Sequence, residues 1–285
     1  MFDWESLRHF IALGRAGTLS GAARALAVDH ATVSRRIAAL ENELQTKLVE
    51  RLPRSCTLTA SGAQVFDLAT AMEASAFGIE RMVRAEQTPL SGKVTVSAPP
   101  VLVTHLLAHR LSEFRAKYPE ITLSMSAQPQ QVSLSRREAD VALRLTRPEE
   151  PNNVVRKIGH IPYALYASPS YTFFDNPERW AFIAYDAQFV DLPQQQWLMQ
   201  IAGERRIGCE LSDVSSQLVA ACSGAGIAGL PRFLGDAQPG LKRIEYDGAP
   251  FSRDVWLVVH HDLKRSVPIR AVMDFLTDTV KGVGL

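Results

Sequence analysis

The sequence lacks long apolar runs. No stretch approaches the roughly 20 consecutive apolar residues that cross a membrane, and the first residues, MFDWESLRHF, lack the basic and apolar segments of a secretory signal. We therefore expect a cytoplasmic protein with no membrane partner. The net charge is only +1 over 285 residues, which excludes a uniformly basic nucleic-acid coat. Any contact with DNA must therefore come from a local basic patch.

Cysteine is scarce as well. The three cysteines, Cys56, Cys209 and Cys222, form no CxxC pair and have no metal-binding spacing with histidine. A redox switch between Cys209 and Cys222 is one interpretation. The apolar neighbours of Cys222 favour the other, in which the thiols are buried and unreactive.

The common catalytic motifs are also missing. The sequence has no GxSxG, HExxH, P-loop or dinucleotide fingerprint, so we expect no enzyme and no cofactor. His260-His261-Asp262 has metal-ligand residue types, but it follows the alternating run 255–259. Adjacent side chains of a strand point to opposite faces. The pattern therefore predicts a strand end, and no metal site.

Residues 19–44 carry the most informative pattern. Val33, Ile37, Leu40 and Leu44 are spaced 4-3-4, as on one face of a helix. The segment 19–26 reads as a shorter helix, and the residues between the two can only form a turn. Two tightly joined helices are typical of a helix-turn-helix, whose second helix enters the DNA major groove.

The exposed face of this second helix carries DNA-binding chemistry. Asp29 is the expected N-cap, and Thr32 and Arg35 have side chains that bond bases or phosphates. The alternative, an ordinary solvated helix face, is less consistent with the helix-turn-helix spacing. Two further arginines lie in the segment 47–59, which reads as two short strands of a wing; the alternative is an exposed loop. The predicted DNA-binding residues are Ser20, His30, Ala31, Thr32, Ser34, Arg35, Arg36, Arg51 and Arg54.

Residues 60–87 predict one long helix with a single apolar stripe. The stripe consists of Val65, Leu68, Met72, Ala76, Ile79 and Val83. Such a stripe needs a partner, either the second domain or, as we prefer, the same helix of a second chain. A homodimer in turn implies a pseudo-palindromic operator in double-stranded DNA.

The rest of the chain alternates strands and helices. Strands are expected at 94–97, 121–125 and 141–145, with helices at 102–118 and 132–138 between them. This order predicts a largely parallel sheet covered by helices. A second unit of the same kind follows from residue 163, and a helix over 269–280 closes the chain.

These patterns together resemble the LysR-type transcriptional regulators. The residues that carry the resemblance are Leu7-Arg8-His9-Phe10, Ala22-Ala23, Val33-Ser34-Arg35, Leu40-Glu41, Leu58-Thr59-Ala60-Ser61-Gly62 and 137–144. The resemblance implies an α/β protein with an N-terminal winged helix-turn-helix, a long linker helix and a C-terminal periplasmic-binding-protein-like domain of two α/β subdomains. It also implies a homotetramer, with RNA polymerase as a further candidate partner. The expected boundaries are 1–59, 60–90 and 91–285, with subdomain I at 91–161 and 260–285 and subdomain II at 162–259.

The resemblance implies a small-molecule effector between the two subdomains. Ligands of open α/β sheets bind where strands end and helices begin, and helix N-termini favour an anion such as a carboxylate. The predicted effector-binding residues are Ala98, Pro99, Pro100, Val101, Gln128, Gln130, Arg144, Asp186, Gly226 and Ile227. The alternative for each residue is that it only forms a structural turn. The alternative for the whole domain is that it binds no effector and only mediates assembly. A solute-binding protein would have the second domain without the helix-turn-helix.

Overall fold

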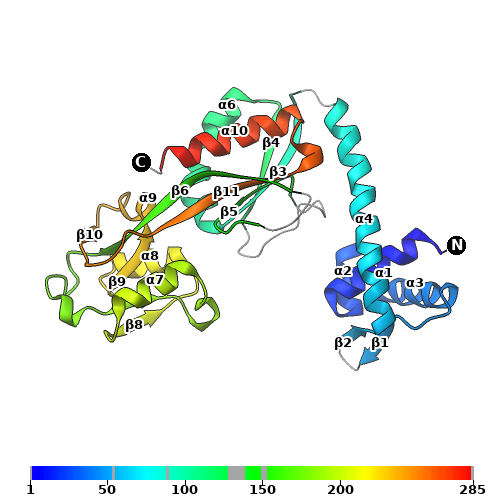
Figure 1. The fold of residues 1–285 in the computed structure, drawn as a ribbon, viewed down its shortest axis with the longest axis horizontal. Helices are drawn as coiled ribbons and strands as arrows, with labels where there is room; N and C mark the ends of the chain where they lie inside the picture. Colours follow the sequence, from blue (N-terminus) through cyan, green and yellow to red (C-terminus); the bar gives the residue numbers. More distant parts are fainter. Residues whose placement is uncertain (1, 53–54, 88–89, 128–138, 149–152, 284–285) are drawn as a thin grey trace. The chain divides into compact units, whose positions relative to one another are not determined.

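The computed structural model describes residues 2–52, 55–87, 90–127, 139–148 and 153–283 (Figure 1). The chain divides into two compact units, Met1–Glu80 and Arg81–Leu285. Each unit is described by itself below. Among the described residues, no helix has the length and apolar character needed to span a bilayer.

Three short helices and a hairpin build the first unit, as the sequence predicts. A left-handed Gly17 (φ 64°) ends the first helix, and Thr18 and Asp29 cap the next two with their side chains. The hairpin is antiparallel and pairs Val49 with Leu58. The elements are α1 (Trp4–Ala16), α2 (Leu19–Leu26), α3 (His30–Glu43), β1 (Val49–Leu52), β2 (Ser55–Leu58) and α4 (Ala60–Gln87).

The core of this unit joins all three short helices to the start of α4. Phe10, Ile37 and Leu40 are completely or almost completely buried, and Phe66 of α4 packs against the same cluster. A Cβ on Gly14 would lie 2.5 Å from the Phe66 ring, so the glycine permits the close approach of α1 and α4. The first turns of α4 therefore fold with the helix-turn-helix.

The described strands of the second unit form one mixed nine-stranded sheet, in the order β4-β3-β5-β11-β6-β9-β7-β8, with β10 paired to β6. In the first lobe β3 is parallel to β4 and β5, which confirms the predicted parallel arrangement. The elements of this lobe are β3 (Gly92–Ala98), α5 (Pro100–Leu102), a π-helical turn (Val103–Leu107), a 3-10 turn (Ala108–Arg110), α6 (Leu111–Lys117), β4 (Ile121–Ala127), β5 (Val141–Arg144) and α10 (Val267–Lys281).

In the second lobe β7 is parallel to β8 and β9. The elements of this lobe are β7 (Phe182–Ala184), α7 (Pro193–Ala202), β8 (Ile207–Glu210), α8 (Val214–Cys222), β9 (Ile227–Pro231), α9 (Arg232–Gly235) and β10 (Lys242–Ile244).

Two long strands belong to both lobes: β6 (Asn153–Ala167) and β11 (Ser252–His260). The end of β6 pairs with β9 and β10, and its beginning pairs with β11. Residues 256–259 of β11 also pair with β5 of the first lobe. The expected assignment of 162–259 to one subdomain therefore differs from the sheet, because the second half of β11 lies in the first lobe. Amphipathic patterning identifies a strand but not which neighbours it pairs with.

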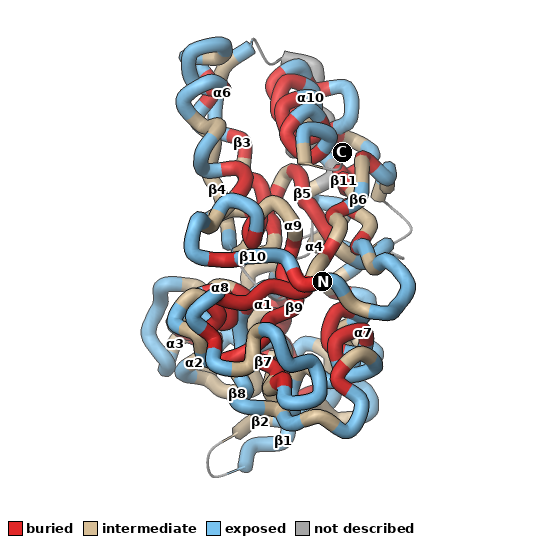
Figure 2. The backbone as a smooth tube through the Cα atoms, turned by 90° about the vertical axis from the view of Figure 1, so that its left-hand side faces the viewer, coloured by how far each residue is buried: buried red, intermediate tan, exposed pale blue. Residues whose placement is uncertain are grey.

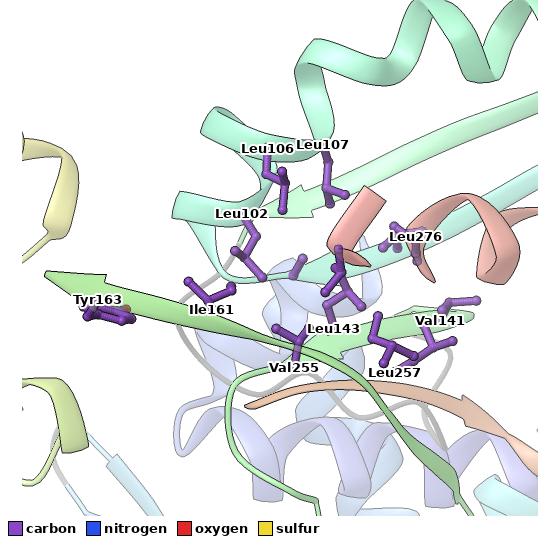
Figure 3. Packing of buried hydrophobic residues seen from close by; sticks show 14 of the residues in the cluster. Leu102, Leu106, Leu107, Val141, Leu143, Ile161, Tyr163, Val255, Leu257 and Leu276 are labelled. Carbon is purple, nitrogen blue, oxygen red and sulfur yellow. The ribbon is translucent and has the colours of Figure 1, made fainter. Parts of the chain in front are cut away.

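Buried side chains cover the central strands on the helix side. Leu143, Val255 and Leu257 of the sheet contribute to one cluster with Leu107 and Leu276 of the helices (Figure 3). Along the chain, β5, β9 and the inward face of α10 are buried, whereas the turns between elements are exposed (Figure 2).

Two parts of the sequence prediction differ from the fold, and a third is not covered by the described residues. The helix predicted over 102–118 is interrupted by π-helical and 3-10 turns. The helix expected over 132–138 lies outside the described residues. The first half of β6 and helix α7 were not predicted, because neither segment shows a clear period of two or of 3.6 residues.

Candidate DNA-binding surface and effector site

The N-terminal turn of α3 presents a hydrogen-bonded group of polar side chains. Asp29 caps the helix, accepting hydrogen bonds from the Thr32 N–H and hydroxyl at 2.7 Å each. These bonds hold the pKa of Asp29 below its ordinary value. The Arg35 guanidinium donates to the Thr32 hydroxyl (3.1 Å) and stays exposed. The cap thus orients Thr32, and Thr32 orients Arg35.

The start of α3 and the start of α2 meet the hairpin at a small hollow. Ser20, His30, Leu52, Ser55 and Cys56 are among the side chains that line it. The Cys56 N–H donates to the Gly17 carbonyl (2.7 Å), which fixes the hairpin beside the turn between α1 and α2. The structure therefore brings the predicted residues Ser20 and His30 together with the hairpin.

The other predicted DNA contacts have different surroundings. Ala31 and Arg51 are exposed, and Ser34 is half-buried on α3. Arg36 forms an ion pair with Asp3, the N-cap of α1, at 2.8 Å. Arg36 therefore has a partner within the protein that Arg35 does not share. Arg54 lies outside the described residues.

The hairpin is attached to α3 through Glu41. The buried Glu41 carboxylate accepts hydrogen bonds from the N–H groups of Leu48 (2.8 Å) and Val49 (3.1 Å), and from Lys47 Nζ (3.0 Å). Burial opposes ionisation, but these donors outweigh it, so the pKa of Glu41 lies below its ordinary value. In the sequence Glu41 stands out only as part of the Leu40-Glu41 pair of the family resemblance, and its role in holding the hairpin was not predicted.

Several predicted effector residues lie at the carboxyl ends of parallel strands. Ala98 ends β3, Arg144 ends β5, and Asp186 follows the end of β7. Arg144 is buried and donates to the Ser97 carbonyl (3.3 Å), the Ser97 hydroxyl (3.2 Å) and the Leu143 carbonyl (2.9 Å). Asp186 accepts from the Gln188 N–H at 3.0 Å. Gln128 and Gln130 lie outside the described residues.

Helix N-termini offer little to an anion here. Pro99 and Pro100 carry no N–H at the start of α5. This helix is a single short turn that contains the half-buried Val101 and ends at Leu102. At α8 the Asp213 carboxylate already accepts from the Ser216 N–H at 2.9 Å. Among the described residues near these strand ends, the arginine side chains are the charged groups available to an anion.

Gly226 and Ile227 lie at the opposite end of the sheet from the other candidates. They precede and begin β9, whereas the strand ends named above are carboxyl ends. A Cβ on Gly226 would lie 2.5 Å from the Ala181 carbonyl oxygen, and the Ile227 N–H donates to that oxygen (2.9 Å). Packing of β9 against β7 accounts for the positions of these two residues, and their role in effector binding stays a prediction.

Sequence reasoning missed a buried arginine that links the two lobes. Arg253 of β11 donates to the Leu145 carbonyl (2.9 Å) and the Thr146 hydroxyl (3.2 Å), and also to the Gln194 side chain of α7. Burial lowers the pKa of Arg253 and raises the pKa of Tyr185, which follows β7. A single arginine in an otherwise amphipathic strand gave no sequence signal.

A second contact also joins the lobes. His105 Nε2 and Ser215 Oγ lie 3.0 Å apart, within hydrogen-bond distance, although 110 residues separate them in the sequence. Burial, with a smaller contribution from His109, lowers the pKa of His105. Together with Arg253, this contact brings polar groups of both lobes close to the carboxyl ends of the parallel strands.

A large open hollow lies elsewhere in the second lobe. It measures about 1300 Å³ and is lined by Trp180, Arg205, Arg206 and Tyr246 among others. Trp180 and Arg206 precede β7 and β8, so this hollow lies at the amino ends of those strands. None of the predicted effector residues that the structure describes lines it.

The three thiols are free and half-buried. Cys209 and Cys222 pack against one apolar cluster of the second lobe, and burial raises the pKa of the Cys209 thiol. A raised pKa disfavours the reactive thiolate.

Comparison with known proteins defines the class. Residues 4–63 match the model of the bacterial regulatory helix-turn-helix protein, lysR family, and residues 87–281 match the LysR substrate binding domain. The chain therefore belongs to the LysR family of transcriptional regulators, which are not enzymes. This confirms the resemblance and the expected class of fold.

Individual relatives agree with this assignment. The chain is 26% identical to the Mau operon transcriptional activator of Paracoccus denitrificans over 97% of this chain and 96% of the relative. It is 30% identical to the uncharacterized HTH-type transcriptional regulator YhjC of Escherichia coli, over 61% of this chain and 58% of that one.

Solved structures show the same fold. The structure of CrgA, a LysR-type regulator from Neisseria meningitidis, matches with a TM-score of 0.57 and 24% identity over 98% of this chain and 99% of that one. A full-length variant of OxyR from Pseudomonas aeruginosa matches with a TM-score of 0.65 and 17% identity over the whole of both chains.

Proposed function

We propose that this LysR-type regulator reads its operator with the first two turns of α3. The observation that carries the proposal is the ordered series Asp29, Thr32 and Arg35 on an exposed helix face. Helix-turn-helix proteins contact base edges with the first turns of their second helix. An arginine whose side-chain conformation is held by such a hydrogen bond is suited to bidentate contact with guanine.

The two arginines of α3 are expected to differ. The Arg35 guanidinium donates to the Thr32 hydroxyl on its own helix face, and it forms no salt bridge with the acidic residues that the structure describes. Arg36 is paired with Asp3 on α1. We therefore assign base reading to Arg35 and a supporting role to Arg36.

The test is a binding series with operator DNA and single base-pair variants. Arg35→Ala is expected to cost about 1 to 3 kcal/mol and to relax the preference at one position. Arg8→Ala, which removes an exposed arginine paired with Glu5 on α1, is the matched control. If Arg35→Ala weakens binding equally on every sequence, Arg35 contacts phosphate and the assignment is wrong.

We propose further that a small effector binds at the carboxyl ends of the parallel strands, beside the contacts that join the lobes. Arg144 and Arg253 bring two buried guanidinium groups to this region, and Tyr185 adds a half-buried phenol. Buried arginines are the groups that recognise a carboxylate through paired hydrogen bonds. A carboxylate effector is therefore the proposed class.

The effector proposal is tested by thermal unfolding with a panel of small mono- and dicarboxylates and their amides. Binding stabilises the folded state in proportion to occupancy, so a carboxylate should raise the melting temperature where its amide does not. Tyr185→Phe should reduce the shift, while Arg206→Ala, in the separate hollow of the second lobe, should leave it unchanged. No shift with any carboxylate would favour a second domain that only mediates assembly.

The stripe on α4 supports a homodimer. Leu68, Met72 and Ile79 lie on α4 with 69%, 47% and 64% of their surfaces exposed. Exposed leucine, methionine and isoleucine at helical spacing are typical of a helix that pairs with a second helix. The proposed partner is α4 of a second chain, and a twofold dimer would bind a pseudo-palindromic operator.

A further inference from the structure

The end of β11 carries a cluster of potential metal ligands apart from the proposed effector residues. The strand ends at His260, and a 3-10 turn, His261–Leu263, begins at the next residue. The ring centroids of His260 and His261 lie only 4.9 Å apart, with 36° between the planes. The alternation expected from the sequence does not apply, because it requires extended backbone at both residues.

The two imidazoles share one carboxylate. His260 Nδ1 lies 3.2 Å from Asp262 Oδ2, and His261 Nε2 lies 2.9 Å from Asp262 Oδ1. One donor atom from each of the three residues can be chosen so that all lie within 4.8 Å of one another. Ligand atoms at about 2.0 to 2.2 Å from a tetrahedral zinc ion are about 3.3 Å apart. The two nitrogen–oxygen distances are thus close to those of a metal site.

We propose that His260, His261 and Asp262 bind one divalent transition-metal ion of the zinc class. Two imidazole nitrogens and one carboxylate oxygen form a donor set that suits Zn²⁺, Co²⁺ and Ni²⁺. Magnesium and calcium prefer sites built of oxygen atoms. With three protein ligands, the ion keeps a position for water.

The burial of the three residues supports such a site. The His260 side chain is 4% exposed, that of Asp262 is 22% exposed and that of His261 is 58% exposed. His260 is held in the strand by its pairing with Asn153 of β6. The inner ligand is therefore fixed by the sheet, while the outer ligand faces solvent, where an ion enters with its water.

Binding of the ion would replace a hydrogen bond inside the cluster. The Asp262 N–H donates to His260 Nδ1 at 3.4 Å, and the ion would take the place of this donor at the nitrogen lone pair. Since β11 also carries Arg253, the ion would fix one end of a strand whose other end joins the lobes.

The test is titration of the purified full-length protein with Co²⁺, followed by its visible absorption and by competition with Zn²⁺. Wild type should bind one Co²⁺ per chain at the site, and Zn²⁺ should displace it and raise the melting temperature. Mg²⁺ should do neither. His261→Ala and Asp262→Asn should each weaken binding by about 100-fold or more, since even indirect disturbance of ligands costs 10- to 100-fold.

His109→Ala is the matched control, because His109 is also exposed and lies on another segment of the first lobe. It should bind Co²⁺ like wild type. His261 is exposed, so its removal should leave the fold intact, which circular dichroism of the metal-free protein checks. Equal Co²⁺ binding by wild type and His261→Ala, or no Co²⁺ binding by wild type at 100-fold excess over protein, would overturn the proposal.

Discussion

Glu41 offers the sharpest test of how the wing is held on the recognition helix. Replacing it with alanine removes the acceptor of two backbone N–H groups, those of Leu48 and Val49. Hydrogen bonds to a charged group contribute about 1.5 to 3 kcal/mol each. The ion pair with Lys47 adds little, because 82% of the lysine side chain is exposed.

The expected loss is about 3 kcal/mol for local opening of the wing. This value takes the lower limit of about 1.5 kcal/mol for each of the two bonds. The lower limit applies because water can accept hydrogen bonds from the two N–H groups once the wing opens. At 1.36 kcal/mol per tenfold change, the loss corresponds to about 150-fold faster amide exchange. Glu41→Gln keeps a neutral acceptor oxygen, so it should lose about half of this free energy.

Hydrogen–deuterium exchange of the peptide covering 45–58 in the full-length protein measures the effect. Glu50→Ala is the matched control, because Glu50 is exposed on β1 of the same wing. If Glu41→Ala exchanges as slowly as wild type, Glu41 does not hold the wing.

The pKa of Glu41 gives this prediction a pH dependence. The folded protein holds the pKa below the ordinary value of 4.5. The contribution is therefore complete above pH 4.5 and is lost as the pH falls through the folded pKa. Wing protection should be constant from pH 5 to 8 and should fall in more acidic solution. Protection that declines already between pH 8 and 6 would contradict the proposed role of the carboxylate.

Three further predictions concern other parts of the chain. Gly226→Ala should destabilise the second lobe by about 2 kcal/mol, because the added Cβ would clash with the Ala181 carbonyl oxygen. The melting temperature should fall by about 4 to 8 °C. An unchanged melting temperature would contradict the close contact between Gly226 and Ala181. Burial lowers the pKa of His105 from its ordinary value of 6.5. The contribution of neutral His105 to the stability of the domain is therefore complete above pH 6.5 and decreases as the pH falls below that value. His105→Gln should remove this pH dependence of thermal unfolding. Leu68→Glu should shift sedimentation from dimer toward monomer, and an unchanged dimer would exclude the α4 stripe as the interface.

The first unit was largely predictable because its signals are local. Apolar residues at helical spacing located α1 and α3, and Asp29 marked the start of α3 because a cap acts within four residues of its own position. The polar side chains of the α3 face were also readable, since they lie between the apolar positions. The partner of Arg36 was not, because Asp3 is 33 residues away in the sequence.

The second unit shows where sequence reasoning ends. Individual strands such as β3 and β5 were predicted, as was the run 255–259 of β11, but not that β6 and β11 pass through both lobes, because strand pairing depends on distant segments. The same reason hid the bonds of Arg253 with Thr146 and Gln194. Gly226 shows the same limit, because glycine marks both ligand approach and tight packing, and its close contact with the Ala181 carbonyl cannot be seen in the sequence.

Footprinting of the purified protein on DNA upstream of its own gene tests the central claim most directly. The account predicts a protected, twofold-symmetric site that persists at physiological salt and that Arg35→Ala weakens at one base position in each half. Protection that has no defined boundary, disappears with modest salt and is unaffected by Arg35→Ala would contradict it, because binding to phosphate alone is independent of sequence and strongly salt-dependent.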